Sequence, residues 1–194
     1  MARWVFEPGH TAAEFRARHM MVSWVRGHFK EVHGALEFDP ENPAQLSLEA
    51  TIQTAKLWTG EPQRDEHLRS ADFIDVAHHP AITFRSTRSD CVGATDYKVQ
   101  GDLSIRGISR QVTLDLHYLG KWRTPYWTAS GNAGTVTRLG FVGETTLNRH
   151  DFQVSWNGQL EEGGVVVSAE IDITIDVEAL LEPELKALSG GATA

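Results

Sequence analysis

The stretch Val165-Val166-Val167-Ser168-Ala169-Glu170-Ile171-Asp172-Ile173-Thr174-Ile175-Asp176-Val177 decides the fold class of this 194-residue chain. Its odd-numbered positions are all apolar, and from Ser168 onward its even-numbered positions are polar or charged. Because successive side chains of a strand point to opposite faces, this pattern predicts an antiparallel strand with one buried face and one wet face. At about 3.3 Å per residue the strand would be roughly 40 Å long, which suits a tall barrel better than a compact sandwich.

Similar alternation recurs along the chain, and it predicts an all-β fold. The best runs lie at 13–19, 46–53, 97–103 and 112–118, and the turn Arg106-Gly107-Ile108-Ser109 joins the last two. Weaker candidates lie at 4–7, 25–39, 81–87, 138–147 and 152–157. Together these runs indicate about eight to ten strands. The segment 121–137 shows no alternation and is predicted to be a long loop or rim.

A short helix is predicted among these strands, in the run Arg64-Asp65-Glu66-His67-Leu68-Arg69-Ser70. Pro62 fits the first helical position, where its missing N–H is not needed. Arg64, His67 and Leu68 then share one face at three- and four-residue spacing, whereas Asp65 and Arg69 form an exposed pair. Such a helix either plugs the end of a barrel or carries a site, and the sequence leaves both alternatives open.

Composition and charge argue against several classes of partner. Eighteen basic and 26 acidic side chains give a net charge of −8, which disfavours nucleic acid and attraction to an anionic membrane surface. No stretch approaches the ~18 apolar residues of a membrane-spanning helix. The single cysteine, Cys91, cannot form an internal disulfide, which fits a reducing compartment or one where disulfides are not needed. With no signal peptide visible, we expect a soluble cytoplasmic protein, or a periplasmic or secreted one if a leader has been trimmed.

No catalytic constellation stands out, so we expect no catalytic residue, no metal ion and no cofactor. The nine histidines lack the spacing of a metal site, and no Gly-x-Ser-x-Gly elbow or phosphate-binding loop is present. His19 lies on the apolar face of its predicted strand, either as a satisfied core histidine or as a ligand contact. Arg149 lies between two apolar runs, where it could bond loop carbonyls, pair with a carboxylate or meet a ligand.

Several of these motifs together resemble the YceI-like family. The similar stretches follow one another in the family's order: His10-Thr11-Ala12 through Arg18-His19-Met20, Val25-Arg26-Gly27-His28-Phe29, the segment from Arg64 to Phe73, Gly101-Asp102-Leu103-Ser104-Ile105-Arg106-Gly107, and Asn148-Arg149-His150-Asp151-Phe152. The resemblance covers about residues 4 to 178. It implies an extended, lipocalin-like antiparallel barrel of about eight strands with a short helical insertion near 61–75. It also implies non-catalytic binding of an isoprenoid or another long amphiphilic lipid inside the barrel.

We therefore predict one barrel domain over 1–180, followed at 181–194 by a short helical stretch and a flexible tail. The predicted apolar ligand contacts are Phe15, Ala17, Met20, Met21, Trp24, Phe29, Trp58, Leu68, Phe73, Phe84, Leu103 and Phe141. The predicted head-group contacts are His19, Arg64, His67, Asn148 and Arg149. Gln153 replaces the family's usual glycine after Asp-Phe and is expected to narrow one end of the cavity.

The expected partner is a long-chain lipid or isoprenoid, which acts as a ligand and not as a cofactor. Two alternatives remain. One is a small enzyme with a site at the barrel mouth around Arg64, Asp65 and His67, where ionisable groups lie beside predicted apolar walls. The other is an interaction module, with a possible homodimer formed by strand pairing at an open edge.

Overall fold

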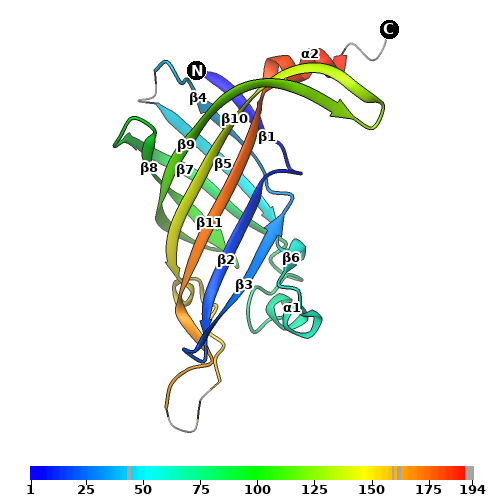
Figure 1. Cartoon of the computed structure of the whole chain (residues 1–194). Coiled ribbons are helices and arrows are strands. Elements are labelled where there is room, and N and C mark those ends of the chain that lie inside the picture. Colours follow the sequence, from blue (N-terminus) through cyan, green and yellow to red (C-terminus); the bar gives the residue numbers. More distant parts are fainter. Residues whose placement is uncertain (43–44, 159, 161–162, 191–194) are drawn as a thin grey trace.

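The computed structural model describes residues 1–42, 45–158, 160 and 163–190 of the chain. Within these residues, eleven strands form one antiparallel sheet (Figure 1). In chain order the strands are β1 (Ala2–Phe6), β2 (Ala12–His19), β3 (Ser23–Lys30), β4 (His33–Phe38), β5 (Leu46–Gln53), β6 (Leu57–Trp58), β7 (Ala81–Cys91), β8 (Asp96–Ile105), β9 (Ile108–Thr128), β10 (Gly131–Asn148) and β11 (Val167–Leu181). The helices are α1 (Pro62–Arg69) and α2 (Glu182–Gly190), with short 3-10 turns η1 (Thr54–Lys56) and η2 (Arg149–Phe152).

The sheet closes into a barrel because β1 pairs with both β4 and β11. β1 pairs with the C-terminal end of β11 and β2 pairs with its N-terminal part, so β1 and β2 share one strand position. β3 and β4 share the next position, because β2 pairs with β3 and β1 with β4. With β5 and β7–β11 these make eight positions. The predicted eight-stranded antiparallel barrel is therefore confirmed.

The N-terminus and α2 lie at one end of the barrel (Figure 1). This end is filled with aromatic side chains. The ring of Phe38 lies 5.8 Å from that of Tyr97, 5.2 Å from Tyr118 and 5.3 Å from Phe141, edge to face in each case. The indole N–H of Trp4 donates to the carbonyl of Phe38 at 3.0 Å. Edge-to-face aromatic pairs add stability beyond their buried area. The interior of the barrel is therefore packed with side chains at this end.

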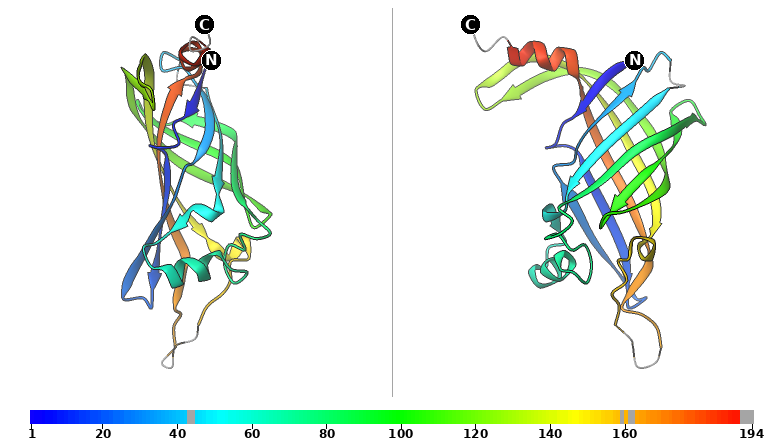
Figure 2. Two further views of the ribbon diagram at one scale, coloured as in Figure 1. Left: turned by 90° about the vertical axis from the view of Figure 1, so that its right-hand side faces the viewer. Right: turned by 180° about the vertical axis from the view of Figure 1, so that it is seen from behind.

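The hairpin of β9 and β10 projects beyond the wall at the same end, where α2 contacts β10, β11 and β1 (Figure 2). Its outer part contains the segment 121–137, which was predicted to be a loop but pairs from Gly131 with Thr128 through Thr137 with Arg123. That prediction is wrong because most side chains of this part are exposed on both faces, so no apolar alternation marks the strands. Of the helical stretch and tail predicted at 181–194, α2 takes Glu182–Gly190, and residues 191–194 lie outside the described residues.

Two of the weaker strand predictions are also corrected. The run 25–39 is divided at Glu31, whose backbone φ of 58° lies in the left-handed region, into β3 and β4. The run 152–157 contains the end of η2 and an irregular segment instead of a strand. This segment follows Gln153, which also has a left-handed backbone (φ 58°, ψ 24°). At both breaks a left-handed backbone conformation interrupts the extended strand.

Helix α1 begins at Pro62 as predicted, and the Glu61 side chain caps it by accepting from the backbone N–H groups of Gln63 and Arg64. The predicted exposed pair of Asp65 and Arg69 is wrong. Asp65 is only 4% exposed, and Arg69 donates to the carbonyl of Leu57. Both side chains point to the segment preceding the helix and not to each other, because α1 is held against β6. No helix among the described residues is long and apolar enough to cross a membrane.

Candidate functional site

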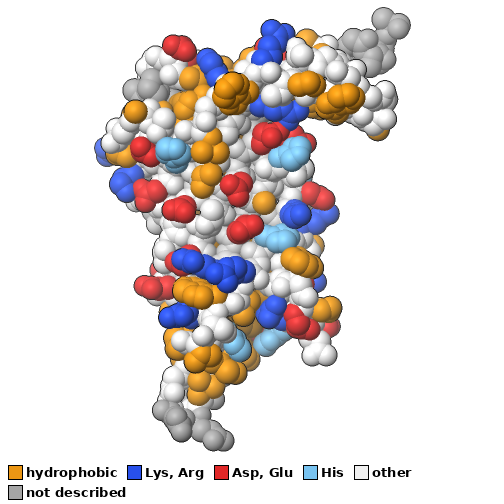
Figure 3. Space-filling model, viewed as in Figure 1, with side chains coloured by type: hydrophobic (Ala, Val, Ile, Leu, Met, Phe, Trp, Pro, Cys, Tyr) orange, Lys and Arg blue, Asp and Glu red, His pale blue; other side chains and the backbone are white. Residues whose placement is uncertain are grey.

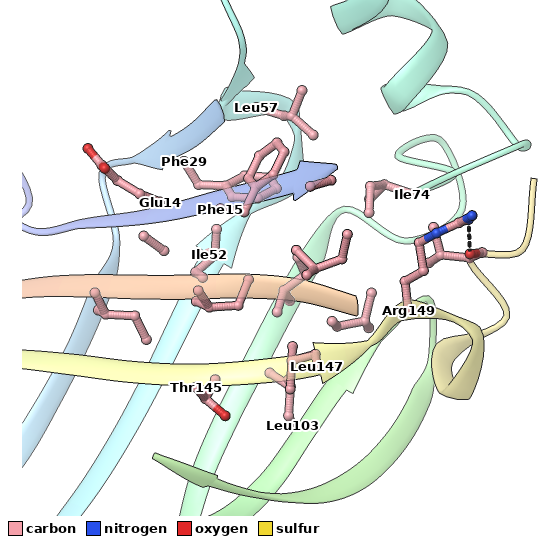
Figure 4. Close-up of a pocket in the computed structure, with 18 of the residues that line it drawn as sticks. Glu14, Phe15, Phe29, Ile52, Leu57, Ile74, Leu103, Thr145, Leu147 and Arg149 are labelled. Atoms are coloured by element: carbon pink, nitrogen blue, oxygen red, sulfur yellow. Dashed lines mark hydrogen bonds between the residues drawn. The ribbon is translucent and has the colours of Figure 1, made fainter. Parts of the chain in front are cut away.

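The half of the barrel opposite the aromatic core contains a cavity of about 620 Å³. Apolar side chains from both helical and strand segments line nearly all of it (Figure 4). This volume is in the usual range for a site that encloses one small organic molecule, roughly 300–1,000 Å³. Closed barrels of about eight strands are wide enough to hold one such ligand where side chains leave space.

Strand β11 shows how one apolar face passes from cavity to core. Ile171, Ile173 and Ile175 line the cavity and are only partly buried, because they border open space instead of packed neighbours. Further along the same face, Val177 and Ala179 belong to the packed core and are buried. The alternation that predicted the strand therefore also marks the cavity wall.

The segment η1–β6–α1 covers a gap between β3 and β5 in the barrel wall, at the end that contains the cavity. β3 pairs with β6 through His28 with Trp58 and Phe29 with Leu57, whereas β5 pairs with β4 and β7. Behind β6, α1 contributes Arg64, His67 and Leu68 to the cavity lining. The helix is thus a barrel plug whose inner face forms part of the cavity, so the two alternatives for it are compatible.

His67 is one of the polar residues of α1 that line the cavity. Its Nε2 lies 2.9 Å from a carboxylate oxygen of Asp72. Its ring meets those of Phe73 and Trp156 edge to face, at centroid distances of 5.0 and 4.7 Å. The contact with Asp72 fixes the ring, while the aromatic contacts join α1 to the segment after η2. His67 is therefore a fixed polar group in a cavity wall that is mostly apolar.

Arg64 and Asp65 are used to hold α1 to Thr59. The Asp65 carboxylate accepts from the Thr59 N–H at 2.8 Å and from the Thr59 hydroxyl. The Arg64 Nε donates to the same hydroxyl at 2.7 Å, and its Nη2 donates to the Thr59 carbonyl at 3.1 Å. Among the hydrogen bonds of the described residues, none joins two of Arg64, Asp65 and His67. Arg64 and Asp65 are thus engaged with Thr59 and not with His67.

Arg149 is only 5% exposed and lines the cavity from η2. Its guanidinium donates to four backbone carbonyls: Ser168 at 2.8 Å, Val154 at 2.6 Å, Trp156 at 2.9 Å and Val167 at 3.3 Å. Burial lowers the pKa of this guanidinium. No ion pair of Arg149 exists within the described parts of the chain. Arg149 therefore joins the segment after η2 to the start of β11, which is the carbonyl-bonding role that the sequence left open.

Twelve of the predicted contact residues line the cavity: Phe15, Ala17, Phe29, Leu68, Phe73, Phe84, Leu103, Phe141, His19, Arg64, His67 and Arg149. Contact of these side chains with a ligand stays a prediction. The structure does not bring the remaining five to the cavity. Met20, Met21, Trp24 and Trp58 are exposed. Asn148 instead caps η2, where its Oδ1 accepts from the His150 N–H at 3.0 Å.

The two tryptophans lie on the outer face of the sheet. Trp24 lies under the guanidinium groups of Arg16 and Arg18, at 4.7 and 4.8 Å from the ring centroid. Trp58 packs against His28 at 4.9 Å. In β3 the inward positions are Val25, Gly27 and Phe29, so Trp24 had to point outward by strand alternation.

Sequence reasoning missed other lining residues, among them Ile52, Ile74, Ile82, Ile105, Leu147, Phe152, Val154, Trp156, Ile171, Ile173 and Ile175. For the three isoleucines of β11 the signal was available in the alternation. For Val154 and Trp156 no local sequence pattern indicated that they line the cavity, because they lie in an irregular segment. Gln153 does not line the cavity, and the expected narrowing is not found there. Its left-handed backbone is the conformation that glycine adopts most easily.

One cluster of metal-type ligands lies outside the cavity. Glu7, His10 and Glu178 place their ligand atoms within 4.8 Å of one another. The His10 Nδ1 lies 2.8 Å from a Glu7 oxygen, and Arg138 pairs with Glu178. Because Arg138 already pairs with Glu178 and His10 contacts both glutamates, the arrangement is a polar cluster that ties the segment before β2 to β10 and β11.

Comparison with known proteins gives the same fold and a family. A model of the YceI-like domain matches residues 4–179. Protein YceI of Escherichia coli is 34% identical over 174 residues, which cover 90% of this chain and 83% of that protein. BcnA of Burkholderia cenocepacia superposes with a TM-score of 0.71 at 22% identity, over 89% of this chain and 98% of BcnA. A polyisoprenoid-binding domain from Saccharophagus degradans superposes with a TM-score of 0.63 at 11% identity, over 93% and 99% of the two chains. From the sequence matches over nearly the whole barrel, the chain belongs to the YceI-like family.

Proposed function

We propose that this protein binds one isoprenoid or other long-chain amphiphilic lipid inside the barrel and catalyses no reaction on it. The observation that carries the proposal is the cavity of about 620 Å³, walled almost entirely by aliphatic and aromatic side chains and closed at one end by the aromatic core. The Saccharophagus domain of the same fold, which is described as polyisoprenoid-binding, supports the ligand class.

The energetics favour a ligand that is mostly hydrocarbon. An isoprene unit of five carbons gains at most ~4 kcal/mol when it is fully buried, at ~0.8 kcal/mol per carbon. Three units gain ~12 kcal/mol in total, from which association and chain ordering subtract several kcal/mol. Micromolar binding then needs no strong polar contact. The cavity-lining polar groups at the lower end, His19, Arg64 and His67, would orient a head group instead of supplying most of the affinity.

The non-catalytic role is supported by the way in which the ionisable groups are used. Arg64, Asp65 and Arg149 are engaged with backbone and hydroxyl groups, and His67 is bonded to Asp72. The cytoplasmic location, the lack of a cofactor and the possible homodimer stay predictions.

The first experiment is solvent extraction of freshly purified protein, with mass spectrometry of the intact complex and of the extract. We expect one prenyl or fatty molecule per chain. The Ala17→Trp variant places an indole in the cavity wall, where Ala17 lies between Ile171 of β11 and Val25 of β3. It should lower lipid uptake at least tenfold while the far-UV circular dichroism stays unchanged.

The matched control is Ala169→Trp, which makes the same substitution at an exposed position of β11 that does not line the cavity. Its uptake should equal that of the wild type. A protein that is purified empty and also fails to take up fluorescent long-chain lipids would contradict the proposal.

A further inference from the structure

The β2–β3 turn forms an exposed apolar tip at the cavity end of the barrel. The tip consists of Met20, Met21, Val22 and Val165, which are 42, 44, 82 and 38% exposed. The Met20 N–H donates to the Val166 carbonyl at 2.8 Å, which joins the turn to the segment before β11. Scattered exposed apolar residues are ordinary, but a contiguous group at one end of a molecule marks a contact surface.

Directly behind this tip, the outer face of the hairpin carries a basic band, which consists of Arg16, Arg18 and Arg26. In register, Arg18 lies opposite Trp24, and Arg16 lies opposite Arg26. Like charges directly opposite each other destabilise a strand pair. Asp172 pairs with Arg16, but no ion pair of Arg18 or Arg26 occurs among the residues that the structure describes. The band therefore offers two cations to an external anion. Figure 3 shows basic side chains above the apolar lower end of this face.

The order of side chains along the hairpin matches the profile of a bilayer surface. From the turn upward it runs from the apolar tip, through the pair of Trp24 with Arg18, to the pair of Arg16 with Arg26, and then to Glu14 opposite His28. Tryptophan and arginine are enriched at the level of lipid head groups, and apolar side chains lie below them. The acidic residue comes last, farthest from the tip.

The tip also adjoins the cavity. Arg18, His19 and Val25, which flank the β2–β3 turn, line the cavity, and so do Val166 and Val167 beside Val165. A ligand with a long hydrocarbon chain loses ~0.8 kcal/mol per carbon when it enters water. Contact between this end of the barrel and a bilayer would let the chain move between the two apolar environments without crossing water.

We propose that the apolar tip and the basic band form a docking surface for an anionic phospholipid bilayer, through which the ligand enters and leaves the cavity. The net charge of −8 argues for repulsion at a distance. Within a Debye length of about 8–10 Å, however, the local charges of the docking surface dominate. The role of the surface in ligand exchange rests on the proposed function, whereas binding to a bilayer can be tested without it.

The test is co-sedimentation with vesicles of phosphatidylcholine alone and of phosphatidylcholine containing about a third phosphatidylglycerol. The wild type should bind the anionic vesicles, and Met21→Glu/Val22→Glu should weaken binding at least about tenfold. Arg26→Gln, at a position of the basic band that does not line the cavity, should weaken binding to the anionic vesicles roughly fivefold and leave binding to neutral vesicles unchanged. The matched control is Val92→Glu, in the β7–β8 turn at 56% exposure, which should bind like the wild type.

Uptake of a fluorescent long-chain lipid from detergent solution is measured for each variant. Normal uptake together with lost vesicle binding supports the docking surface. Wild-type protein that takes up lipid but binds neither type of vesicle would overturn the docking proposal and leave the proposed function intact. Equal weakening by Val92→Glu, or equal binding of the wild type to the two kinds of vesicle, would also overturn it. A failure of lipid uptake by the wild type would instead contradict the proposed function.

Discussion

At the scale of the residue, Arg149 shows how a buried cation can serve architecture instead of chemistry. Its guanidinium donates to the carbonyls of residues 154, 156, 167 and 168, two groups on each side of an irregular connection. A planar group with five donors is well suited to join several carbonyls at once. Arg149 therefore joins the two sides of this part of the cavity wall, together with Asn157, whose amide bonds the backbone of Val166 and Val167.

Replacement of Arg149 by Met should lower the free energy of unfolding by about 2–4 kcal/mol, because buried carbonyls would lose their donors. Arg149→Lys, which keeps the charge and up to three donors, should cost less. Urea unfolding followed by tryptophan fluorescence measures both variants. Wild-type stability of the Met variant would show that the four hydrogen bonds contribute nothing.

At the scale of the element, β11 is held on its outer face by a polar contact that depends on pH. Asp172 accepts from the Thr146 hydroxyl of β10 at 2.9 Å and from the Arg16 Nε of β2 at 2.9 Å. The hydrogen bond from Thr146, followed by the contact with Arg16, lowers the pKa of the Asp172 carboxyl below its usual value. The carboxylate thus joins three neighbouring strands.

A carboxyl whose folded-state pKa is lowered stabilises the protein above its unfolded-state pKa, and this stability is lost as the pH falls through the folded-state value. The wild type should therefore be more stable than Asp172→Asn at pH 7, and the difference should shrink below about pH 4. Thermal unfolding between neutral and acidic pH measures this, with Asp176→Asn on the same strand as the control. A difference that is constant with pH would contradict the role of the charge.

The same elements show what the sequence could predict. Strand β11 was predictable, because one face meets apolar surroundings and the other meets water at every step. The outer β9–β10 hairpin was not, because water reaches both faces and removes the alternation. Helix α1 was predicted from Pro62 onward, but the burial of Asp65 was not, because its partner Thr59 belongs to the loop before the helix. The extent of the cavity depends on pairing between distant strands, which no local pattern encodes.

At the scale of the whole molecule, the proposed ligand should stabilise the barrel by mass action. A ligand that binds only the folded state adds about 2.7 kcal/mol at a free concentration of 100 times its Kd. For a chain of this length the melting temperature should rise by about 5–10 °C. Differential scanning fluorimetry with the extracted lipid measures the shift, and Ala17→Trp is the control that should show little of it. No shift in the wild type would argue against binding inside the barrel.

The aromatic core gives the cavity a fixed floor, and this has a consequence for the choice of ligand. Phe141 belongs both to the cavity wall and to the ring cluster with Phe38, so the hydrocarbon chain stops where these rings begin. The barrel then works as a ruler, in which β4 and β10 set the end mark. Phe141→Ala would remove a ring from this end of the cavity and let the protein bind a chain about one isoprene unit longer. Mass spectrometry of the bound lipid would measure the change in chain length.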